Sequence, residues 1–204
     1  MRDSAILAVC IKYLGEKMDD LNRLCGIDEA GRGALAGDLY VAGCILKVPI
    51  IGLDDSKKLS EKKREKLYDE IVKNSEFLVL NFSNLQIDEL GLSKCLKMGL
   101  EAIKSHFKEC DFIFDGNTNF GVSGLKTLIK ADAQIPAVSA ASVLAKVSRD
   151  RAMKALSPLY PNYGFEKHKG YGTKFHTDMI AKFGQCEIHR KSFVLKCFEP
   201  TLFD

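Results

Sequence analysis

The sequence predicts an α/β fold, and three observations indicate it. Short apolar runs of strand length, such as LYVAGCIL at residues 39–46, are bounded by polar or glycine-containing segments. Longer segments between them carry apolar side chains at helical spacing, most clearly Leu92, Leu96, Leu100 and Ile103. A chain of 204 residues can bury one substantial core, and no linker or repeat divides it. We therefore expect a single domain over residues 1–204.

The elements are predicted from these runs and from local start and stop signals. The expected strands are residues 24–28, 39–46, 77–82 and 111–115, with 126–129 ambiguous. The expected helices are residues 60–74, 86–108, 138–156 and 173–183, after an N-terminal arm at 1–23. Close spacing of the first two strands favours an antiparallel pair. Ser60 suits a helix N-cap, Pro158 ends the alanine-rich helix, and Gly184 ends the last one. Residues 160–171 are expected to form a loop.

Composition narrows the functional classes. The seven cysteines are scattered without a C-x-x-C pair, which is typical of reduced thiols in a cytoplasmic protein. The apolar run at residues 5–11 is too short to cross a bilayer, and Asp3 is unsuited to a signal peptide, so we expect no membrane partner. The net charge of +3 is uneven: residues 1–140 carry −2 and residues 141–204 carry +5. A basic C-terminal part beside acidic groups suits a polyanionic substrate, although a solvated lysine-rich surface explains the charge equally well.

The stretch GIDEAGRG at residues 26–33 combines several features of a phosphate site. Asp28 and Glu29 are adjacent carboxylates that follow an apolar lead, and the turn Gly31-Arg32-Gly33, the GRG turn, comes directly after them. Glycine lets backbone amides approach a ligand, and arginine offers a planar fork of donors to phosphate. Carboxylates next to a phosphate site usually need a divalent cation between them and the anion. The stretch predicts a metal-dependent site for a phosphate-bearing substrate.

Two further aspartates are candidates for the same site. Asp115 ends an apolar strand, and Asp132 lies in a short polar gap before a helix of small residues. Aspartates at such positions are more often turn formers, and acidic pairs are common on surfaces. If all four carboxylates converge, each pair ~4 Å apart repels by about 4 kcal/mol at an effective dielectric of 20. Divalent cations such as Mg²⁺ would relieve that repulsion, and two of them can promote hydrolysis of a phosphodiester.

Five motifs, taken together, resemble one family. They are GIDEAGRG, DDSKKLS, DFIFDGN, KADAQIPAVSAASVLAKVSRDR and HKGYGTKFH, and they fall in order between residues 24 and about 194. The chain resembles bacterial ribonuclease HII, of the type 2 ribonuclease H family. The resemblance implies a ribonuclease-H-like mixed sheet flanked by helices, with a helical C-terminal extension at about 157–204. It also implies a hydrolase that cleaves the RNA strand of RNA–DNA hybrids and incises 5′ to single ribonucleotides in duplex DNA, as in ribonucleotide excision repair.

The resemblance also assigns roles to positions in this sequence. It implies that Asp28, Glu29, Asp115 and Asp132 bind two Mg²⁺ or Mn²⁺ ions, with products carrying a 5′-phosphate and a 3′-hydroxyl. The remaining positions are implied to contact nucleic acid: Gly31, Arg32 and Gly33 at the ribose 2′-hydroxyl, Tyr171 at the RNA–DNA junction, and Lys57, Ser142 and Lys146 at backbone phosphates. The 2′-hydroxyl is the group by which a protein distinguishes RNA from DNA.

The sequence departs from the family pattern at two positions. Ala34 and Asp38 stand where the common form has prolines, so we expect a looser turn and, from Asp38, slightly weaker phosphate binding. A tail with the sequence PTLFD is similar to motifs that dock on sliding clamps, although an ordinary chain end is the more common explanation. We expect a monomer. His168, His176 and His189 lack finger-like spacing for zinc and favour structural or phosphate-facing roles, with His176 buried beside the Tyr171 loop.

Two other functional classes remain open from the residues. A non-catalytic nucleic-acid-binding protein could use the basic C-terminal part, although four carboxylates without metal would repel phosphate. A nuclease of the same fold class could act on DNA junctions, although Tyr171 and the GRG turn favour ribonucleotide recognition. The sequence leaves the metal used in the cell and the role of residues 1–23 undetermined.

Overall fold

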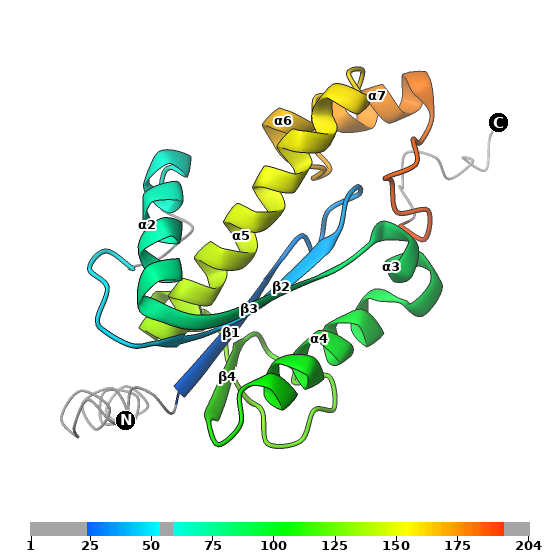
Figure 1. The fold of residues 1–204 in the computed structure, drawn as a ribbon. Helices are drawn as coiled ribbons and strands as arrows, with labels where there is room; N and C mark the ends of the chain where they lie inside the picture. The colour runs from blue at the N-terminus through cyan, green and yellow to red at the C-terminus, as the bar shows by residue number, and fades with distance from the viewer. Residues whose placement is uncertain (1–23, 54–58, 194–204) are drawn as a thin grey trace, which may run out of the picture.

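The computed structural model describes residues 24–53 and 59–193, which form a five-stranded mixed sheet with helices on both faces (Figure 1). The strands lie in the order β3-β2-β1-β4-β5. Their bounds are β1 Leu24–Ala30, β2 Leu39–Leu46, β3 Ser75–Phe82, β4 Asp111–Asp115 and β5 Lys126–Leu128. The β1–β2 and β2–β3 pairs are antiparallel, whereas β4 runs parallel to both β1 and β5. The antiparallel first pair is confirmed.

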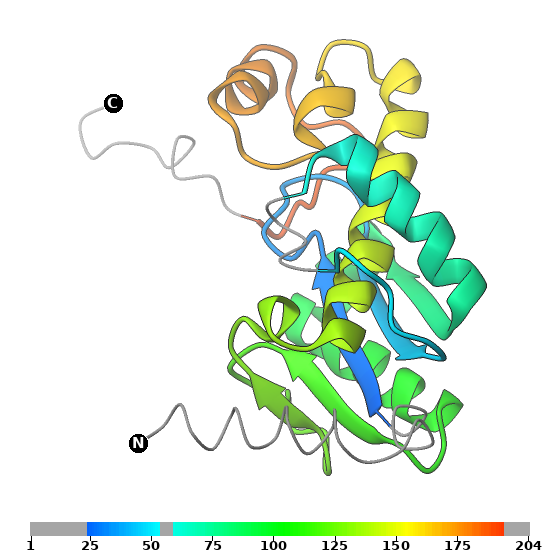
Figure 2. The ribbon, with the colours of Figure 1, turned by 90° about the vertical axis from the view of Figure 1, so that its left-hand side faces the viewer.

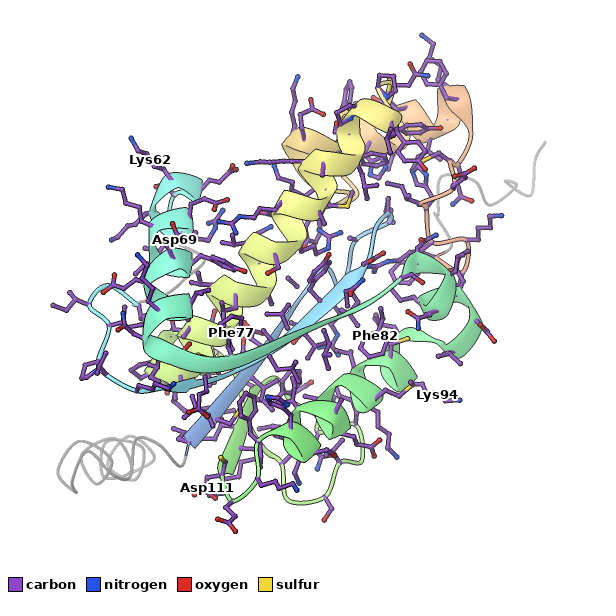
Figure 3. All side chains as sticks on the ribbon, viewed as in Figure 1. Lys62, Asp69, Phe77, Phe82, Lys94 and Asp111 are labelled. Atoms are coloured by element: carbon purple, nitrogen blue, oxygen red, sulfur yellow. The ribbon has the colours of Figure 1, made fainter. Side chains whose placement is uncertain are left out.

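Two helices, α2 (Glu61–Asn74) and α5 (Pro136–Leu156), cover one face of the sheet (Figure 1). The other face is covered by α3 (Asn84–Leu90) and α4 (Leu92–His106). Side chains alternate along β3, so Phe77 packs toward the α5 layer and Phe82 toward the α4 layer; both are labelled in Figure 3.

Close contact between α5 and β1 depends on Gly26. A Cβ atom on Gly26 would lie 2.2 Å from the backbone of Ala137 and Val138, which no side chain could tolerate. The first turns of α5 therefore lie directly on β1. This contact brings the small-residue face of α5 beneath the carboxyl end of the strand.

The C-terminal elements pack against the connection between β1 and β2. They are the 3₁₀ turns and helices η4 (Ser157–Leu159), α6 (Phe165–His168) and α7 (Lys174–Phe183). Ala36 of the β1–β2 connection packs among Met153, Phe165 and Ile180. Figure 2 shows this connection reaching from the sheet toward α6 and α7. Residues from opposite ends of the chain thus meet at one edge of the molecule.

Most predicted elements are confirmed, and two predictions are wrong. The expected helix at 86–108 is divided at Gly91, which adopts φ 82°, so that α3 and α4 are separate helices. A capping box between Ser83 and Gln86 begins α3 two residues earlier than expected. The expected loop at 160–171 contains the short helix α6, and the ambiguous residues 126–129 contribute strand β5. Among the described residues, no helix has the length and apolar character needed to span a membrane.

Candidate active site

A cavity of about 390 Å³ opens at the carboxyl end of β1. It contains most of the residues predicted to form the site. Its lining is Asp28, Glu29, Ala30, Gly31, Arg32, Gly33, Arg64, Asp115, Ser142, Lys146 and Tyr171. The residues come from the end of β1, the GRG turn, α2, β4, α5 and the segment before α7, so distant parts of the sequence converge as expected.

Three aspartates form a compact cluster at this edge of the sheet. Each of Asp28, Asp115 and Asp132 offers one carboxylate oxygen, and these oxygens all lie within 4.8 Å of one another. Parallel pairing sets two of them side by side, because Ile27 is in register with Phe114 and the next residues are Asp28 and Asp115. The third, Asp132, is in the 3₁₀ turn η3 (Ala131–Ala133). Asp115 Oδ1 holds this turn by accepting a hydrogen bond of 3.0 Å from the Ala131 amide.

Glu29 lines the same cavity but is not one of the three clustered carboxylates. Its Oε1 lies 3.5 Å from Arg32 Nη1, and the Arg32 guanidinium also lies 5.4 Å from the centre of the Phe120 ring. The other oxygen, Oε2, is buried and accepts no hydrogen bond from any residue that the structure describes. A buried carboxylate oxygen without a donor is costly to maintain. It is therefore available to a ligand that enters the cavity.

Burial disfavours the charged forms of the two β1 carboxylates, and neighbouring acidic groups add to this effect. The pKa of Asp28 is raised, chiefly by burial and then by the charge of Glu29, although a hydrogen bond with Ser142 opposes the shift. Burial also raises the pKa of Glu29, against the opposing effect of Arg32. The donor atoms are all carboxylate oxygens, the set preferred by hard divalent cations such as Mg²⁺ and Mn²⁺. The three aspartates thus form a site suited to a divalent metal ion.

Replacing Asp28 by Asn is expected to stabilise the protein when metal is removed. A carboxyl whose pKa is raised by folding contributes stability at low pH, and that stability is lost as the pH rises through the folded-state pKa. The introduced amide would carry no charge at pH 7, so in EDTA the variant melts above wild type by about 2–4 °C for each kcal/mol of repulsion removed. Adding Mg²⁺ is expected to raise the melting temperature of wild type more than that of the variant. Differential scanning fluorimetry checks both shifts, and a lower melting temperature for the variant in EDTA would contradict the electrostatic account.

The GRG turn depends on one of its two glycines. Gly31 adopts φ 96°, and a Cβ atom there would lie 2.2 Å from Arg149 Nε. A Cβ atom on Gly33 would meet no atom within 4 Å. Gly31 is therefore required both by its backbone conformation and by the close approach of Arg149. Gly33 instead leaves its backbone open to the cavity.

Two buried arginines hold the connection that follows the GRG turn. Arg149, with no exposed surface, donates to three carbonyls: Ala36 O at 2.9 Å, Asp38 O at 3.0 Å and Lys169 O at 2.8 Å. Arg190, equally buried, donates twice to Gly37 O at 2.7 and 2.9 Å, and once to Arg32 O at 3.3 Å. Neither forms an ion pair with a carboxylate in the described part of the chain. Backbone carbonyls stabilise both buried charges, and the hydrogen bonds from the two arginines fix the connection that follows the GRG turn.

The sequence interpretation missed both arginines. A signal for Arg149 was present, because Ser142, Lys146 and Arg149 are spaced i, i+4 and i+7 and so share one face of α5. A face that presents Ser142 and Lys146 to the cavity brings Arg149 next to the GRG turn. No comparable local pattern marks Arg190, whose partners lie more than 150 residues earlier in the chain.

Replacing Arg149 by Lys is expected to destabilise the fold although the charge is kept. An ammonium group cannot reproduce the planar fork that reaches Ala36 O, Asp38 O and Lys169 O together. Two carbonyls would lose their donor, at about 1–3 kcal/mol each. Arg151→Lys is the matched control, because Arg151 pairs with Glu65 on the exposed surface, where such pairs contribute about 0–1 kcal/mol. Urea denaturation compares the free energies of unfolding, and equal losses in the two variants would contradict the assigned role.

Tyr171 lines the cavity, and its ring lies close to two basic side chains of α5. Its ring centre is 5.4 Å from Lys146 Nζ and 5.0 Å from the Arg149 guanidinium carbon. An isolated antiparallel bridge pairs Tyr171 with Ala34, directly after the GRG turn. The aromatic ring and the turn are thus held together by backbone pairing. Cations against the ring restrict its position further.

The other predicted residues have mixed outcomes. Ser142 and Lys146 line the cavity as expected, and Lys146 Nζ is also 2.7 Å from Asp150 Oδ1. Lys57 and the tail at residues 194–204 lie outside the described residues. Arg64 of α2 also lines the cavity, and the sequence analysis did not assign it to the site. His176 is buried beside the Tyr171 loop, which confirms that prediction.

The two departures from the family pattern are accommodated differently. Ala34 is fully buried and forms the bridge to Tyr171, so the turn is held without proline. Asp38 Oδ2 accepts a hydrogen bond of 2.7 Å from the Asn81 amide, and its backbone carbonyl accepts from Arg149. Asp38 is outside the cavity lining. The structure therefore gives Asp38 a structural partner, and its expected effect on phosphate binding remains a prediction.

Comparison with known proteins supports this geometry. The ribonuclease HII family model matches residues 25–196. Ribonuclease HII from Campylobacter jejuni is 63% identical over 177 residues, covering 86% of this chain and 92% of that protein. Ribonuclease HII from a Sulfurovum species is 56% identical over 181 residues, covering 88% and 96%. The solved ribonuclease HII of Archaeoglobus fulgidus, in complex with PCNA, has a TM-score of 0.71 and 29% identity, covering 88% and 98%.

These similarities extend over most of the chain, and the matched residues 25–196 span the positions of the acidic cluster. The ribonuclease-H-like fold expected from the sequence is confirmed by the solved homologue and by the mixed sheet. The chain therefore belongs to the ribonuclease HII family, the metal-dependent endoribonucleases that cleave RNA in RNA–DNA hybrids and at ribonucleotides embedded in duplex DNA.

Proposed function

We propose that this chain performs the family reaction with Asp28, Glu29, Asp115 and Asp132 holding two divalent ions. The observation that carries the proposal is the convergence of the three aspartate oxygens within 4.8 Å, with Glu29 on the same cavity. The buried Glu29 Oε2 supplies a further oxygen without a donor among the described residues. When bound, Mg²⁺ or Mn²⁺ would supply the activation of water and the stabilisation of the leaving oxygen for in-line hydrolysis.

The chain's own residues position the substrate for this reaction. Ser142 is hydrogen-bonded to Asp28 and so fixes the orientation of one carboxylate. Arg32 holds Glu29 in place through their 3.5 Å contact, and a ligand that competes for Glu29 would free the guanidinium for a phosphate. Lys146 lines the cavity wall from α5 and brings positive charge toward the backbone of the cleaved strand. We assign Lys57 the same role on the basis of sequence alone.

Ribonucleotide selection is assigned to the GRG turn and Tyr171. Gly33 leaves the backbone of the turn open, so that amide and carbonyl groups can bond a 2′-hydroxyl and its flanking phosphate. A pocket built to bond a hydroxyl can reject the substrate that lacks it by ~10⁴–10⁵. Tyr171, which lines the same cavity, would pack on the nucleotide at the RNA–DNA junction. Its bridge to Ala34 keeps the two recognition groups at a constant separation.

The remaining assignments concern organisation and partners. We propose one catalytic domain over residues 1–204, with about 157–204 as a C-terminal extension, acting as a monomer in the cytoplasm. The Archaeoglobus fulgidus homologue was solved with PCNA, a sliding clamp, and this chain's tail at residues 194–204 is the candidate for an equivalent contact.

Analysis of the cleaved ends tests the proposed reaction. Attack by water leaves a 5′-phosphate and a 3′-hydroxyl, whereas attack by the ribose 2′-hydroxyl would leave a cyclic phosphate. We expect only the first type of end from a hybrid cut in the presence of Mg²⁺, detected by mass spectrometry of the products. Cyclic-phosphate ends would contradict the proposed roles of the four carboxylates.

A further inference from the structure

Three histidines form a connected group behind Tyr171. His176 and His189 are fully buried, and their Nε2 atoms lie 3.0 Å apart. His168 stacks on His176 with ring centres 4.4 Å apart. The surrounding rings are Phe165 and Tyr163, so the group lies in an apolar environment. None of the three histidines lines the cavity.

The hydrogen-bond partners determine which nitrogen of each ring carries a proton. The backbone amide of Cys186 donates to His189 Nδ1 at 2.9 Å, so this nitrogen is an acceptor and the proton is on His189 Nε2. His189 Nε2–H then donates to His176 Nε2, which places the proton of His176 on Nδ1. His176 Nδ1–H donates to the Tyr171 carbonyl at 3.0 Å. These three hydrogen bonds therefore run in one direction, from the Cys186 amide to the Tyr171 carbonyl.

His168 holds the backbone on the N-terminal side of Tyr171. Its Nδ1 accepts from the Gly170 amide at 3.2 Å, and its Nε2–H donates to the Tyr163 carbonyl at 2.7 Å. The Gly170 carbonyl in turn accepts from Leu35 and Ala36, which follow the GRG turn. The backbone on both sides of Tyr171 is thus held by histidine nitrogens and by the residues that follow the GRG turn.

We propose that the His189–His176 pair is a positioning device that fixes the Tyr171 backbone, and with it the aromatic ring, for selection of a single ribonucleotide. The proposal rests on the proposed role of Tyr171. His176 and His189 would act only by positioning Tyr171, without touching the substrate. Both rings must be neutral in this arrangement. A second proton on His176 would point Nε2–H at the Nε2–H of His189, and a second proton on His189 would point Nδ1–H at the Cys186 amide. Burial lowers the pKa of His176 to about 4 and also lowers that of His189, which is consistent with neutral rings.

Nuclear magnetic resonance of ¹⁵N-histidine-labelled protein tests the geometry directly. The sequence contains four histidines, so the spectrum is simple to assign. We expect His176 as the neutral Nδ1–H tautomer and His189 as the neutral Nε2–H tautomer at pH 7. For His168 we expect the proton that bonds the Tyr163 carbonyl to be on Nε2. His176 found as the Nε2–H tautomer, or charged, would overturn the proposal. This measurement uses the wild-type protein and does not depend on the fate of any variant.

Two amide variants test the functional consequence. The side-chain nitrogen of Asn is the same number of bonds from Cα as Nδ1 of His, and that of Gln matches Nε2. His176→Asn can therefore still donate to the Tyr171 carbonyl, whereas His176→Gln can reach only His189. We expect His176→Gln to lower the ratio of single-ribonucleotide cleavage to hybrid cleavage by about tenfold, the usual effect of one hydrogen bond. His176→Asn is expected to recover most of that ratio.

His106→Gln is the matched control, because His106 is exposed on α4 and makes none of these contacts. Equal ratios for His176→Gln and His176→Asn would overturn the positioning role. Tyr171→Ala is measured beside them to separate this inference from the proposed function. If Tyr171→Ala lowers the ratio and His176→Gln does not, only the histidine inference fails. If Tyr171→Ala leaves the ratio unchanged, the proposed role of Tyr171 is wrong. The effect of the histidine pair on substrate choice is then wrong too.

Discussion

Asp28→Asn is expected to reduce cleavage by on the order of 10³-fold or more while binding of the hybrid persists. Asp28 is buried at the centre of the acidic cluster, and Asn keeps its shape but removes the charge that a divalent cation needs. A catalytic metal contributes several kcal/mol of charge stabilisation to the transition state, and each 1.4 kcal/mol is about tenfold in rate. The proposed contacts of Lys146 with phosphate and of Tyr171 with the junction nucleotide do not involve Asp28 and are expected to persist. Single-turnover cleavage of a labelled hybrid and a gel-shift titration measure the two properties separately.

Asp111→Asn provides the control on the same strand. Asp111 begins β4 and is exposed, whereas Asp115 ends it in the cavity. Asp111 forms a surface ion pair with Lys126 at 3.5 Å. The control is expected to cleave at the wild-type rate. Full activity in Asp28→Asn would remove Asp28 from the metal site, and loss of hybrid binding in that variant would point to a folding defect instead.

Tyr171→Ala is expected to lose far more activity on a single embedded ribonucleotide than on a long hybrid. Stacking of a base or sugar on an aromatic side chain contributes about 1–3 kcal/mol, equivalent to about 10- to 100-fold. A long hybrid offers many positions at which the turn can find a 2′-hydroxyl, whereas an embedded ribonucleotide offers one junction. The measurement is the ratio of kcat/KM on the two substrates for variant and wild type.

Tyr68→Ala controls for the loss of an aromatic ring beside a cation. Tyr68 lies on α2, and its ring centre is 4.3 Å from the Arg151 guanidinium carbon, yet it is outside the cavity lining. We expect it to affect stability and to leave the substrate ratio unchanged. Equal losses on both substrates in Tyr171→Ala would remove Tyr171 from junction recognition while leaving the metal site intact.

The sequence predicted the parts of the site that depend on strand geometry. Asp28 and Asp115 follow short apolar runs, and parallel pairing of those runs sets the two aspartates side by side. Ser142 and Lys146 were assigned through the family resemblance, and the structure places both at the cavity on α5. The family resemblance was needed to add Tyr171, because no local pattern distinguishes this tyrosine from others in a loop.

Two of the features that the sequence did not predict depend on long-range backbone contacts. Arg190 donates to carbonyls of the β1–β2 connection, and no spacing in the sequence marks a carbonyl as its partner. The direction of the His189–His176 chain depends on the Cys186 amide, which is known only from the fold. The division of the expected helix at 86–108 is a matter of backbone conformation instead. Ile87 of α3 and Leu96 of α4 pack in the same core, and the positive φ of Gly91 separates the two helices.

Both buried arginines and the histidine pair converge on the same short segments. Arg149 fixes Lys169, His176 fixes Tyr171, and Arg190 fixes Arg32, each through a backbone carbonyl. The three clustered aspartates are held differently, by the register of β1 with β4 and by the 3₁₀ turn that contains Asp132. The contacts that hold the acidic cluster are therefore separate from those that hold the groups proposed to select a ribonucleotide. Variants that weaken selection can retain hydrolysis of a long hybrid.

The most direct test of the account is incubation with a DNA duplex that contains one ribonucleotide. An all-DNA duplex of the same sequence and a parallel reaction with EDTA are the controls. We expect one incision, on the 5′ side of the ribonucleotide, only when Mg²⁺ or Mn²⁺ is present, and no incision of the all-DNA duplex. Cleavage that persists in EDTA, or that occurs equally in the all-DNA duplex, would contradict the assignment of the acidic cluster and of the GRG turn.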